Sequence, residues 1–379
     1  MTITYPEAIV VGLLQGVSEL FPVSSLGHSI LLPALIGGRW ASDLNVAAPE
    51  SPYLAFIVGL HVATAAALLV YFWRDWLRII TGFVTSLRYR RVETAEERLA
   101  WMIIVATIPI GLAGLLLEHT FRTVLGRPAP AAVFLVLNGI ILYGAERLRR
   151  RATDEPAQRR RRPIAVGTDE RGTVYSSSTY AERRDTGLVT ADAGHPGGKP
   201  GAGPDGGVGD GGVGDGGVGD GGVGGGGRQP APAMSFGDAT ETAGTADESN
   251  ARIARRRIAE TTLIGSAQIL ALLPGISRSG VTMAAGLRRG LSHEDAARFS
   301  FLLATPVILA AGALKLPDLT GPMGNGIGGQ VLLGSLASAV GAYAAVRWLT
   351  RYFQTRTLTP FAIYCVAAGL ASLVYLAIR

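Results

Sequence analysis

The stretch LAFIVGLHVATAAALLVYFW, at residues 54–73, runs for twenty residues without an Asp, Glu, Lys or Arg. A helix needs about 20 consecutive apolar residues to cross the hydrocarbon core of a bilayer. A helix of this composition would be apolar on every side, which suits burial in lipid and does not suit the surface of a water-soluble domain. The stretch therefore predicts a membrane-spanning helix.

Further runs of this kind predict a polytopic helical protein with six spans. Apolar residues make up 48% of the 379-residue chain and charged residues 17%, against about a quarter in soluble domains. The N-terminus has neither a basic region nor a small-residue cleavage site, so we do not expect a signal peptide. The single cysteine, Cys365, excludes a disulfide framework and is expected to serve packing. The other five runs are 99–117, 129–145, 299–316, 331–349 and 358–378.

The chain divides into two hydrophobic portions, residues 1–146 and 258–379, separated by an Arg-, Gly- and Asp-rich insert at 147–257. Residues 201–227 contain 17 glycines, and Gly-Gly-Val-Gly-Asp repeats within them every five residues. Calcium-binding β-rolls also repeat Gly and Asp, but with a period of nine residues. Since such a tract cannot bury enough apolar surface to offset its conformational entropy, the insert is predicted to be a disordered linker.

Arginines gather at both edges of the insert and in the connection at 74–98, whereas the connections at 37–52, 118–128 and 317–330 carry far fewer. Positively charged flanks stay on the cytoplasmic side. The insert is therefore predicted to be cytoplasmic and both termini outside, so the two sets of three spans have opposite orientation. These flanks also account for the net charge of +6 and the pI near 9.7, and no nucleic-acid partner is predicted.

A segment interrupted by Pro, Gly and Ser precedes each set of spans, at 5–36 and at 260–291. The topology requires both ends of each segment on one side of the membrane. Irregular backbone is tolerated at membrane depth only when it is buried in protein or lines a water-filled cavity. We therefore expect two re-entrant helical hairpins. In each, a Gln is followed by Pro and then Ser, so the fold class predicted is all-α, with two inverted-topology repeats of one hairpin and three spans.

The first hairpin carries the parts of an activated nucleophile. Gln15 and Glu19 share one face of a helix that Pro22 ends. The turn that follows holds Ser24, Ser25, Gly27 and His28. The alternative is that the serines cap a helix and that Glu19 is bonded to a neighbour.

The second hairpin carries a candidate phosphate site, PGISRSGVT at residues 274–282. Glycine backbone donors, hydroxyls and an arginine fork at a helix start suit a phosphate. The residues concerned are Gly275, Ser277, Arg278, Ser279, Gly280 and Thr282. The alternative is that Arg278 pairs with Glu19 and only holds the hairpins together. Among the other polar residues at membrane depth, His61 is expected to be bonded inside the bundle, and Asn138 and Gln268 to be interhelical partners.

These motifs resemble the bacterial undecaprenyl-diphosphate phosphatase family, also called the bacitracin-resistance type. The resemblance rests on QGVSELFPVSSLGH at 15–28, AQILALLPGISRSGVT at 267–282 and FSFLLATP at 299–306. It covers both hydrophobic portions and not the insert. Two departures are Leu26, where members commonly carry a hydroxyl residue, and Gln15 in place of a glutamate, which leaves one carboxylate fewer for a cation.

The resemblance implies an enzyme of the bacterial cell membrane, a hydrolase that converts undecaprenyl diphosphate to undecaprenyl phosphate. This recycles the lipid carrier of cell-wall peptidoglycan synthesis and confers bacitracin resistance. Ser25 is the preferred nucleophile, with Glu19 and His28 moving protons and Arg278 stabilising charge; direct attack by His28 is an alternative. The residues expected to bind the phosphate come from both hairpins and are Ser24, Gly275, Ser277, Arg278, Ser279 and Thr282.

A divalent cation, Mg²⁺ or Ca²⁺, is expected at Glu19 and Gln15, because hard cations prefer oxygen ligands. The expected partners are the polyprenyl diphosphate and membrane lipids, with a homodimer left open. The rival function is a polyprenyl-phosphate flippase or transporter, since inverted repeats also build transporters. Such a carrier would need Arg278 but would have no need of Ser25 beside His28.

Overall fold

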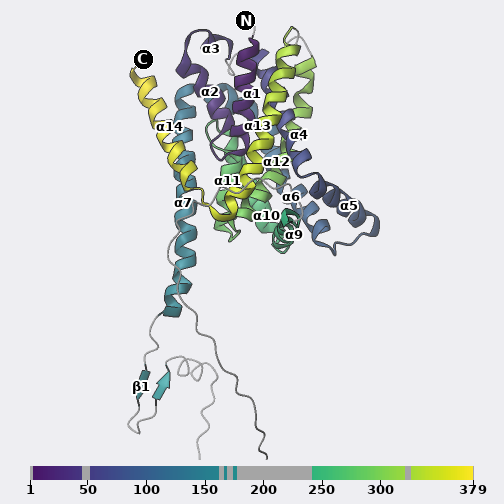
Figure 1. Ribbon diagram of the computed structural model, residues 1–379, viewed down its shortest axis with the longest axis vertical. Helices are drawn as coiled ribbons and strands as arrows, with labels where there is room; N and C mark the ends of the chain where they lie inside the picture. The colour runs from purple at the N-terminus through teal and green to yellow at the C-terminus, as the bar shows by residue number, and fades with distance from the viewer. Residues whose placement is uncertain are drawn as a thin grey trace, which may run out of the picture. The chain divides into compact units, whose positions relative to one another are not determined.

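The computed structural model describes residues 3–44, 52–161, 166–168, 174–176, 241–320 and 326–378. The chain forms two compact units, one made of residues 1–156 with 238–379 and the other of residues 157–237. The first unit contains the whole of both hydrophobic portions and is a bundle of helices (Figure 1).

The first half of the bundle begins with two helices joined by a tight turn and continues with long helices. Its elements are α1 (Tyr5–Leu20), α2 (Ser25–Ile36), α3 (Gly38–Asp43), α4 (Pro52–Tyr71), α5 (Trp73–Tyr89), α6 (Ala95–Leu125) and α7 (Pro128–Arg161). The second half repeats this order of short and then long helices. Its elements are α9 (Glu241–Ala254), α10 (Ile258–Ser266), the 3₁₀ helix η2 (Ala267–Leu272), α11 (Arg278–Arg288), α12 (His293–Thr320), α13 (Gly328–Thr355) and α14 (Thr359–Ile378).

The predicted spans are confirmed as helices. By length and composition five helices of the described chain can cross a membrane, namely α6, α7, α12, α13 and α14. A sixth is counted if α4 is taken together with α5, from which it is bent by 85°. Large apolar side chains stay exposed on the outward faces of these helices, for example Leu336 on α13 and Ile363 on α14, as expected of surfaces that meet lipid.

Both interrupted segments are helix–loop–helix, as predicted. Helix α1 begins at a capping box, in which Thr4 and Glu7 satisfy each other's backbone N–H groups. It ends before Pro22, and Ser24 caps the returning helix α2 by accepting from the N–H of Gly27 at 3.2 Å. In the second segment, α10 and η2 lead to a turn that Ser277 ends by capping α11.

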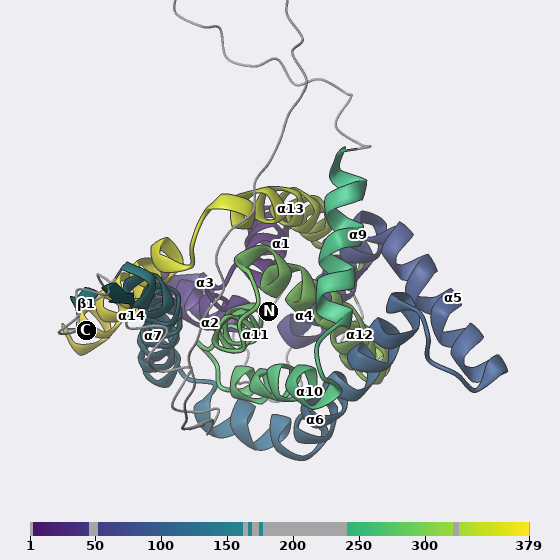
Figure 2. The same ribbon diagram turned by 90° about the horizontal axis from the view of Figure 1, so that it is seen from below.

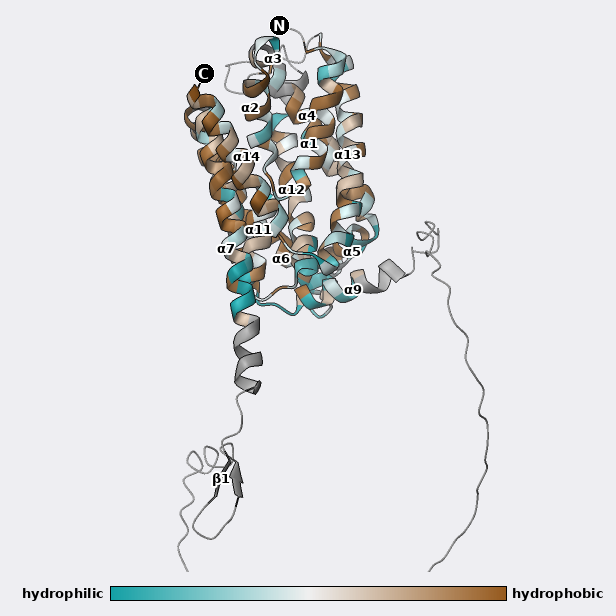
Figure 3. Cartoon of the chain, turned by 60° about the vertical axis from the view of Figure 1, so that its left-hand side comes forward, coloured by the Kyte–Doolittle hydropathy of each residue, from teal (hydrophilic) through white to brown (hydrophobic). Residues whose placement is uncertain are grey.

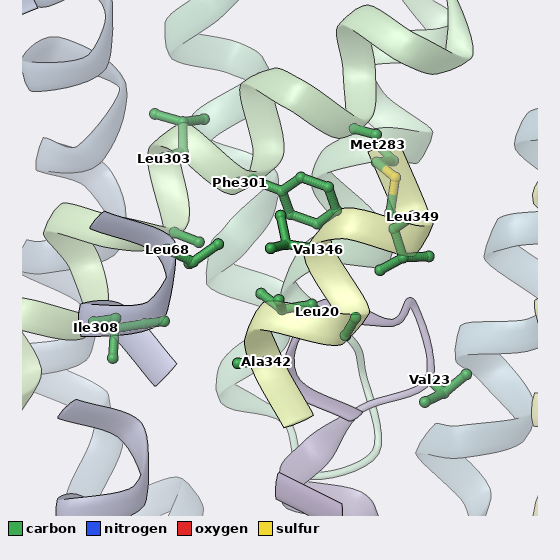
Figure 4. Packing of buried hydrophobic residues seen from close by; sticks show 14 of the residues in the cluster. Leu20, Val23, Leu68, Met283, Phe301, Leu303, Ile308, Ala342, Val346 and Leu349 are labelled. Carbon is green, nitrogen blue, oxygen red and sulfur yellow. The ribbon is translucent and has the colours of Figure 1, made fainter. Parts of the chain in front are cut away.

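Small residues let α1 lie against α13 with its backbone almost in contact. A Cβ at Gly12 would stand 2.3 Å from the carbonyl oxygen of Gly334, and one at Gly16 would stand 2.1 Å from that of Ser338. Such glycine pairs spaced by four residues are a common means of close helix association in membranes. Beyond this crossing, Leu20 packs near Val346 and Leu349 in the buried core (Figure 4).

Close backbone approach at glycine also packs the second hairpin against α6 and α7 against α14. A Cβ at Gly265 of α10 would lie 2.2 Å from the carbonyl oxygen of Ala106 on α6. A Cβ added at Gly139 of α7 would lie 2.6 Å from the carbonyl oxygen of Ala362 on α14. The hairpin of each half therefore packs on a long helix of the other half.

Within this unit, both chain ends lie at one end of the bundle, and α5, α9 and the lower part of α7 lie at the other (Figure 1). The second end is the more hydrophilic one (Figure 3). Helix α9 lies across it (Figure 2) and is held by buried and partly buried polar contacts. Arg252 pairs with Asp295 at 2.8 Å, and Asn250 donates to Asp75 at 2.7 Å and accepts from Arg298 at 2.8 Å. The hydrogen bonds that Arg252 donates to the Asp295 carboxylate keep the pKa of Arg252 above its ordinary value.

The ends of the insert differ from the predicted linker, because both are helical. Helix α7 continues through residues 147–155, which contain no glycine or proline, and ends at Arg161. Arg150 pairs with Glu146 one turn back. Helix α9 forms because it docks on the bundle. The second unit contains a two-stranded antiparallel ladder of β1 (Val166–Thr168) and β2 (Val174–Ser176). The glycine-rich tract at 201–227 lies outside the described residues.

Candidate active site

The turn between α1 and α2 brings Glu19 and Ser25 together. Glu19 lies in the last turn of α1, and Ser25 is the first residue of α2. Ser24, between them, has φ of 69°, a conformation that costs a residue with a Cβ free energy and that is often found at functional sites. This backbone kink reverses the chain, so that the Ser25 hydroxyl donates a hydrogen bond to Glu19 Oε2.

Arg278 reaches the same carboxylate from the second hairpin. Its Nη2 donates to Glu19 Oε1 at 2.5 Å, and its Nη1 donates to the carbonyl of Ala304 at 3.1 Å. The Glu19 side chain is 7% exposed, so its charge depends on these donors. The two hairpins therefore meet at Glu19, and the ion pair that the sequence offered as an alternative is present.

Gln15 and His61 complete this cluster. Gln15 Nε2 donates to Glu19 Oε2 and to His61 Nε2, at 3.0 Å in each case. With its Nε2 accepting from that amide, His61 donates from Nδ1 to the carbonyl of Ile57 at 2.9 Å. His61 is bonded inside the bundle, as predicted, but its partners are residues of the candidate site. We call Gln15, Glu19, Ser25, His61 and Arg278 the carboxylate cluster.

His28 makes its contacts with the backbone of Ser24 and with Tyr364. Its Nδ1 lies 2.7 Å from the carbonyl oxygen of Ser24, and its Nε2 lies 2.7 Å from the hydroxyl of Tyr364 on α14. The two rings are stacked, with their centroids 5.8 Å apart. Among the described residues, no hydrogen bond joins His28 to Glu19, Ser25 or Arg278. Tyr364 was not anticipated, because a tyrosine in an apolar span carries no spacing signal.

The hydroxyls of the second loop also differ from the expected phosphate ligands. Ser277 and Ser279 both donate to the carbonyl of Phe21, at 3.4 and 3.2 Å, and Thr282 donates to the carbonyl of Arg278 at 2.7 Å. The hydroxyls are buried and must find acceptors, and the end of α1 leaves carbonyls without helical partners. In this conformation the serine hydroxyls join the two turns.

The two turns are in direct contact. Gly275 has φ of 111°, and an added Cβ there would lie 2.3 Å from the carbonyl oxygen of Ala131, so only glycine fits. Asn138 of α7 bridges the turns, because its Nδ2 donates to the carbonyl of Pro22 at 3.1 Å and its Oδ1 accepts from Ser277 N at 3.0 Å. This confirms the prediction that Asn138 is an interhelical partner. Gln268 was predicted to be an interhelical hydrogen-bond partner as well. Its Nε2 does not fit this prediction, because it is buried without a hydrogen-bond acceptor within the described chain.

The oxygen ligands for a cation are few. The described residues contain no group of three or more His, Cys, Asp or Glu that could hold a metal ion. However, Gln15 Oε1 is buried and has no hydrogen-bond partner in the described part of the chain, and it belongs to an amide that contacts Glu19. One carboxylate and one free amide oxygen suit a hard cation that also binds phosphate oxygens of a substrate.

Comparison with known proteins places these residues in a family. The family described as "Bacitracin resistance protein BacA" matches residues 8–168 and 234–371. The chain is 55% identical over 380 residues to the undecaprenyl-diphosphatase of Mycolicibacterium paratuberculosis, covering 100% of this chain and 99% of the relative. It is 54% identical over 375 residues to undecaprenyl-diphosphatase 1 of Frankia casuarinae, covering 97% and 96%.

Proposed function

The chain belongs to the BacA family of bacitracin resistance proteins and is an undecaprenyl-diphosphatase, and on this premise we propose that Ser25 is its nucleophile and Glu19 the base that activates it. The observation that carries the proposal is the hydrogen bond from the Ser25 hydroxyl to Glu19 Oε2. A serine is a weak nucleophile until an adjacent base accepts its proton.

In the proposed reaction, Ser25 Oγ forms a bond to the terminal phosphorus and its proton passes to Glu19. The bond between this phosphorus and the bridging oxygen breaks, and undecaprenyl phosphate leaves with the electron pair. Water then attacks the phosphoserine, releasing phosphate, and the proton returns to Ser25. Phosphoryl transfer depends mainly on positioning and on charge stabilisation.

Arg278 supplies the charge stabilisation in this proposal. Two of its N–H groups are engaged with Glu19 and Ala304 in the described structure, and a guanidinium has five. The others can turn to the equatorial phosphate oxygens. The backbone amides at the start of α11 and the cap residue Ser24 are further candidates for phosphate contact. The serine and threonine hydroxyls of the second loop would have to give up their present acceptors first.

A divalent cation is proposed to be held by Glu19 and the free Oε1 of Gln15, together with substrate oxygens. When bound, it would neutralise part of the diphosphate charge. His28 is proposed as a proton carrier near the leaving group, released from Tyr364 when substrate enters. Direct attack by His28 is the alternative. It requires Tyr364 to move, because the Tyr364 hydroxyl is hydrogen-bonded to His28 Nε2.

Measurement of phosphate release from undecaprenyl diphosphate by purified Ser25→Ala protein tests the nucleophile. We expect turnover to fall by about 10⁴-fold or more, as when a nucleophile is removed. Ser18→Ala is the matched control, since Ser18 lies one residue from Glu19 and its hydroxyl donates to the carbonyl of Leu14 in its own helix, at 2.6 Å. Turnover of Ser25→Ala equal to that of the control would overturn the assignment. Trapped phosphoenzyme that is labile in acid and stable in alkali would identify His28 instead.

The membrane arrangement is proposed to consist of two inverted repeats whose hairpins are re-entrant. Their packing supports this, because α1 crosses α13 at Gly16 and α10 crosses α6 at Gly265, each hairpin meeting a long helix of the other half. The arginine-rich end is proposed to face the cytoplasm of a bacterial cell, with both termini outside. An impermeant thiol reagent should label a cysteine placed at position 200 only from the cytoplasmic side.

A further inference from the structure

Helix α5 leaves the bundle sideways after the 85° bend that separates it from α4 (Figure 1). If α4 crosses the membrane, a helix at nearly a right angle to it runs along the membrane plane. One face of α5 is buried by the bundle through Ile79, Gly82 and Ser86, and Trp101 of α6 donates to the Ser86 hydroxyl at 3.0 Å. The remaining two faces carry no large buried side chain.

The first of these faces is an apolar stripe that the described chain does not cover. Its members are more than half exposed, and their spacing of three or four residues keeps them on one side of the helix. They are Trp73, Leu77, Ile80, Val84 and Leu87. A row of five large exposed apolar side chains is too extensive to face water without a partner.

The second face is polar and basic, and it lies about 100° around the helix from the apolar stripe. It carries Arg74, Arg78, Thr81 and Arg88. Arg78 is paired with Asp247 of α9. The other two arginines stand at opposite ends of the helix, each over an aromatic ring: Arg74 is 5.3 Å from the ring centroid of Trp73, and Arg88 is 5.9 Å from that of Tyr89.

We infer that α5 lies in the interface of the membrane, with its apolar stripe in the acyl region and Arg74 and Arg88 bound to anionic phospholipid headgroups. Apolar and basic faces side by side on one helix match the boundary between hydrocarbon and phosphates. Trp and Tyr at the two helix ends suit the headgroup level, where amphipathic rings collect. Charge complementarity favours anionic lipid over a second copy of the chain, whose α5 would bring the same positive charge.

The test uses the full chain in vesicles of phosphatidylcholine with and without phosphatidylglycerol. A polarity-sensitive fluorophore is attached to Leu77→Cys, to Val84→Cys and, on the basic face, to Thr81→Cys; native Cys365 is fully buried and stays unlabelled. Nitroxide lipids should quench the labels at 77 and 84, and iodide in the water should quench the label at 81. Equal quenching by iodide at all three positions would overturn the inference. Quenching at 77 and 84 that depends on protein density would show that a second copy covers the stripe.

The headgroup part of the inference is tested with charge variants. Each arginine near an anionic surface contributes about 1 kcal/mol, or about fivefold in relative affinity. For the chain labelled at position 77, we define the preference as its affinity for phosphatidylglycerol relative to phosphatidylcholine. Arg74→Gln and Arg88→Gln should each lower this ratio by about fivefold. Raised salt should also lower the ratio in the labelled chain that keeps both arginines. Arg127→Gln removes the same charge from an exposed site outside α5 and should leave the preference unchanged. Equal effects of all three would mean that only the net charge matters, and the headgroup assignment would fall.

Discussion

Glu19 is the residue on which the whole candidate site depends. Its two carboxylate oxygens accept from three side chains that come from three helices or turns: Gln15 and Ser25 at Oε2 and Arg278 at Oε1. A buried carboxylate with this many donors is held in one orientation, with its charge compensated. The same contacts align the Ser25 hydroxyl, so in the proposed mechanism the hydrogen bonds that hold Glu19 also position the nucleophile.

Replacing Arg278 with Lys should therefore affect catalysis more than folding. Lysine keeps the charge, but it has no planar fork that could contact Glu19, the carbonyl of Ala304 and a phosphate together. Loss of one donor to transition-state charge costs about 10²–10³ in turnover. We expect a loss of that order in phosphate release, with the melting temperature nearly preserved. Turnover above about a tenth of the native value would contradict the clamp, and a parallel fall of stability and activity would leave only a structural tie.

Replacing Gln15 with Glu tests the cation proposal. The change turns a free, buried amide oxygen into a second carboxylate beside Glu19, which should raise affinity for a hard cation. The Mg²⁺ or Ca²⁺ concentration that gives half-maximal phosphate release should fall. Gln15→Met, similar in size and without oxygen, should raise that concentration. An unchanged cation dependence in both variants would exclude Gln15 as a ligand.

Among the elements, α1 is the one whose packing depends most on glycine. Its glycines let the α13 backbone lie directly against it at Gly334 and Ser338. Gly16→Ala would place a methyl group 2.1 Å from the carbonyl oxygen of Ser338, and the helices would have to separate. Overpacking of this kind costs about 1–3 kcal/mol, which should lower the melting temperature and, by shifting Glu19, turnover as well.

Gly111→Ala in α6 is the matched control for that substitution. A Cβ at Gly111 would meet nothing within 4 Å, and Gly in a helix is about 1 kcal/mol less favourable than Ala. This variant should be as stable as the native chain or slightly more so. A similar loss in both variants would show that glycine flexibility, and not close approach, matters at the α1–α13 crossing.

At the scale of the whole molecule, the insert at 147–257 contains helix α9, which docks on the bundle, and a segment before it that is expected to be dispensable. Deletion of residues 177–237 keeps α7, α9 and every contact described for them, so phosphate release in detergent should stay near the native rate. A collapse of turnover in a well-folded deletion variant would mean that the removed segment takes part in the reaction.

Extending that deletion through α9 should be destabilising. It removes Arg252 and Ser249, which satisfy the buried carboxylate of Asp295 at 2.8 and 2.6 Å, and Asn250, which joins Asp75 to Arg298. A buried acceptor left without a donor costs about 1–3 kcal/mol, and more if it is charged. A lower melting temperature for the longer deletion alone would show that α9 belongs to the membrane unit.

The sequence by itself determined the helices that can cross a membrane, the two interrupted segments and the family. These are local properties. The apolar character of about 20 consecutive residues decides whether a helix can cross the bilayer. Pro22 follows the end of α1, and the side-chain oxygens of Ser24 and Ser277 cap the helices that follow them. The motifs around Glu19 and Arg278 carried their chemistry in residue type and spacing. The candidate residues were therefore found before their arrangement was known.

Only the tertiary structure decided which partner each buried polar group takes. His28 meets Tyr364, 336 residues away in the chain, and the hydroxyls of Ser277 and Ser279 reach the carbonyl of Phe21. It also decided that α5 turns away from α4 and that α9 docks on the bundle. A buried donor must find an acceptor among the groups that packing brings near it, and packing joins segments whose separation in the sequence carries no signal.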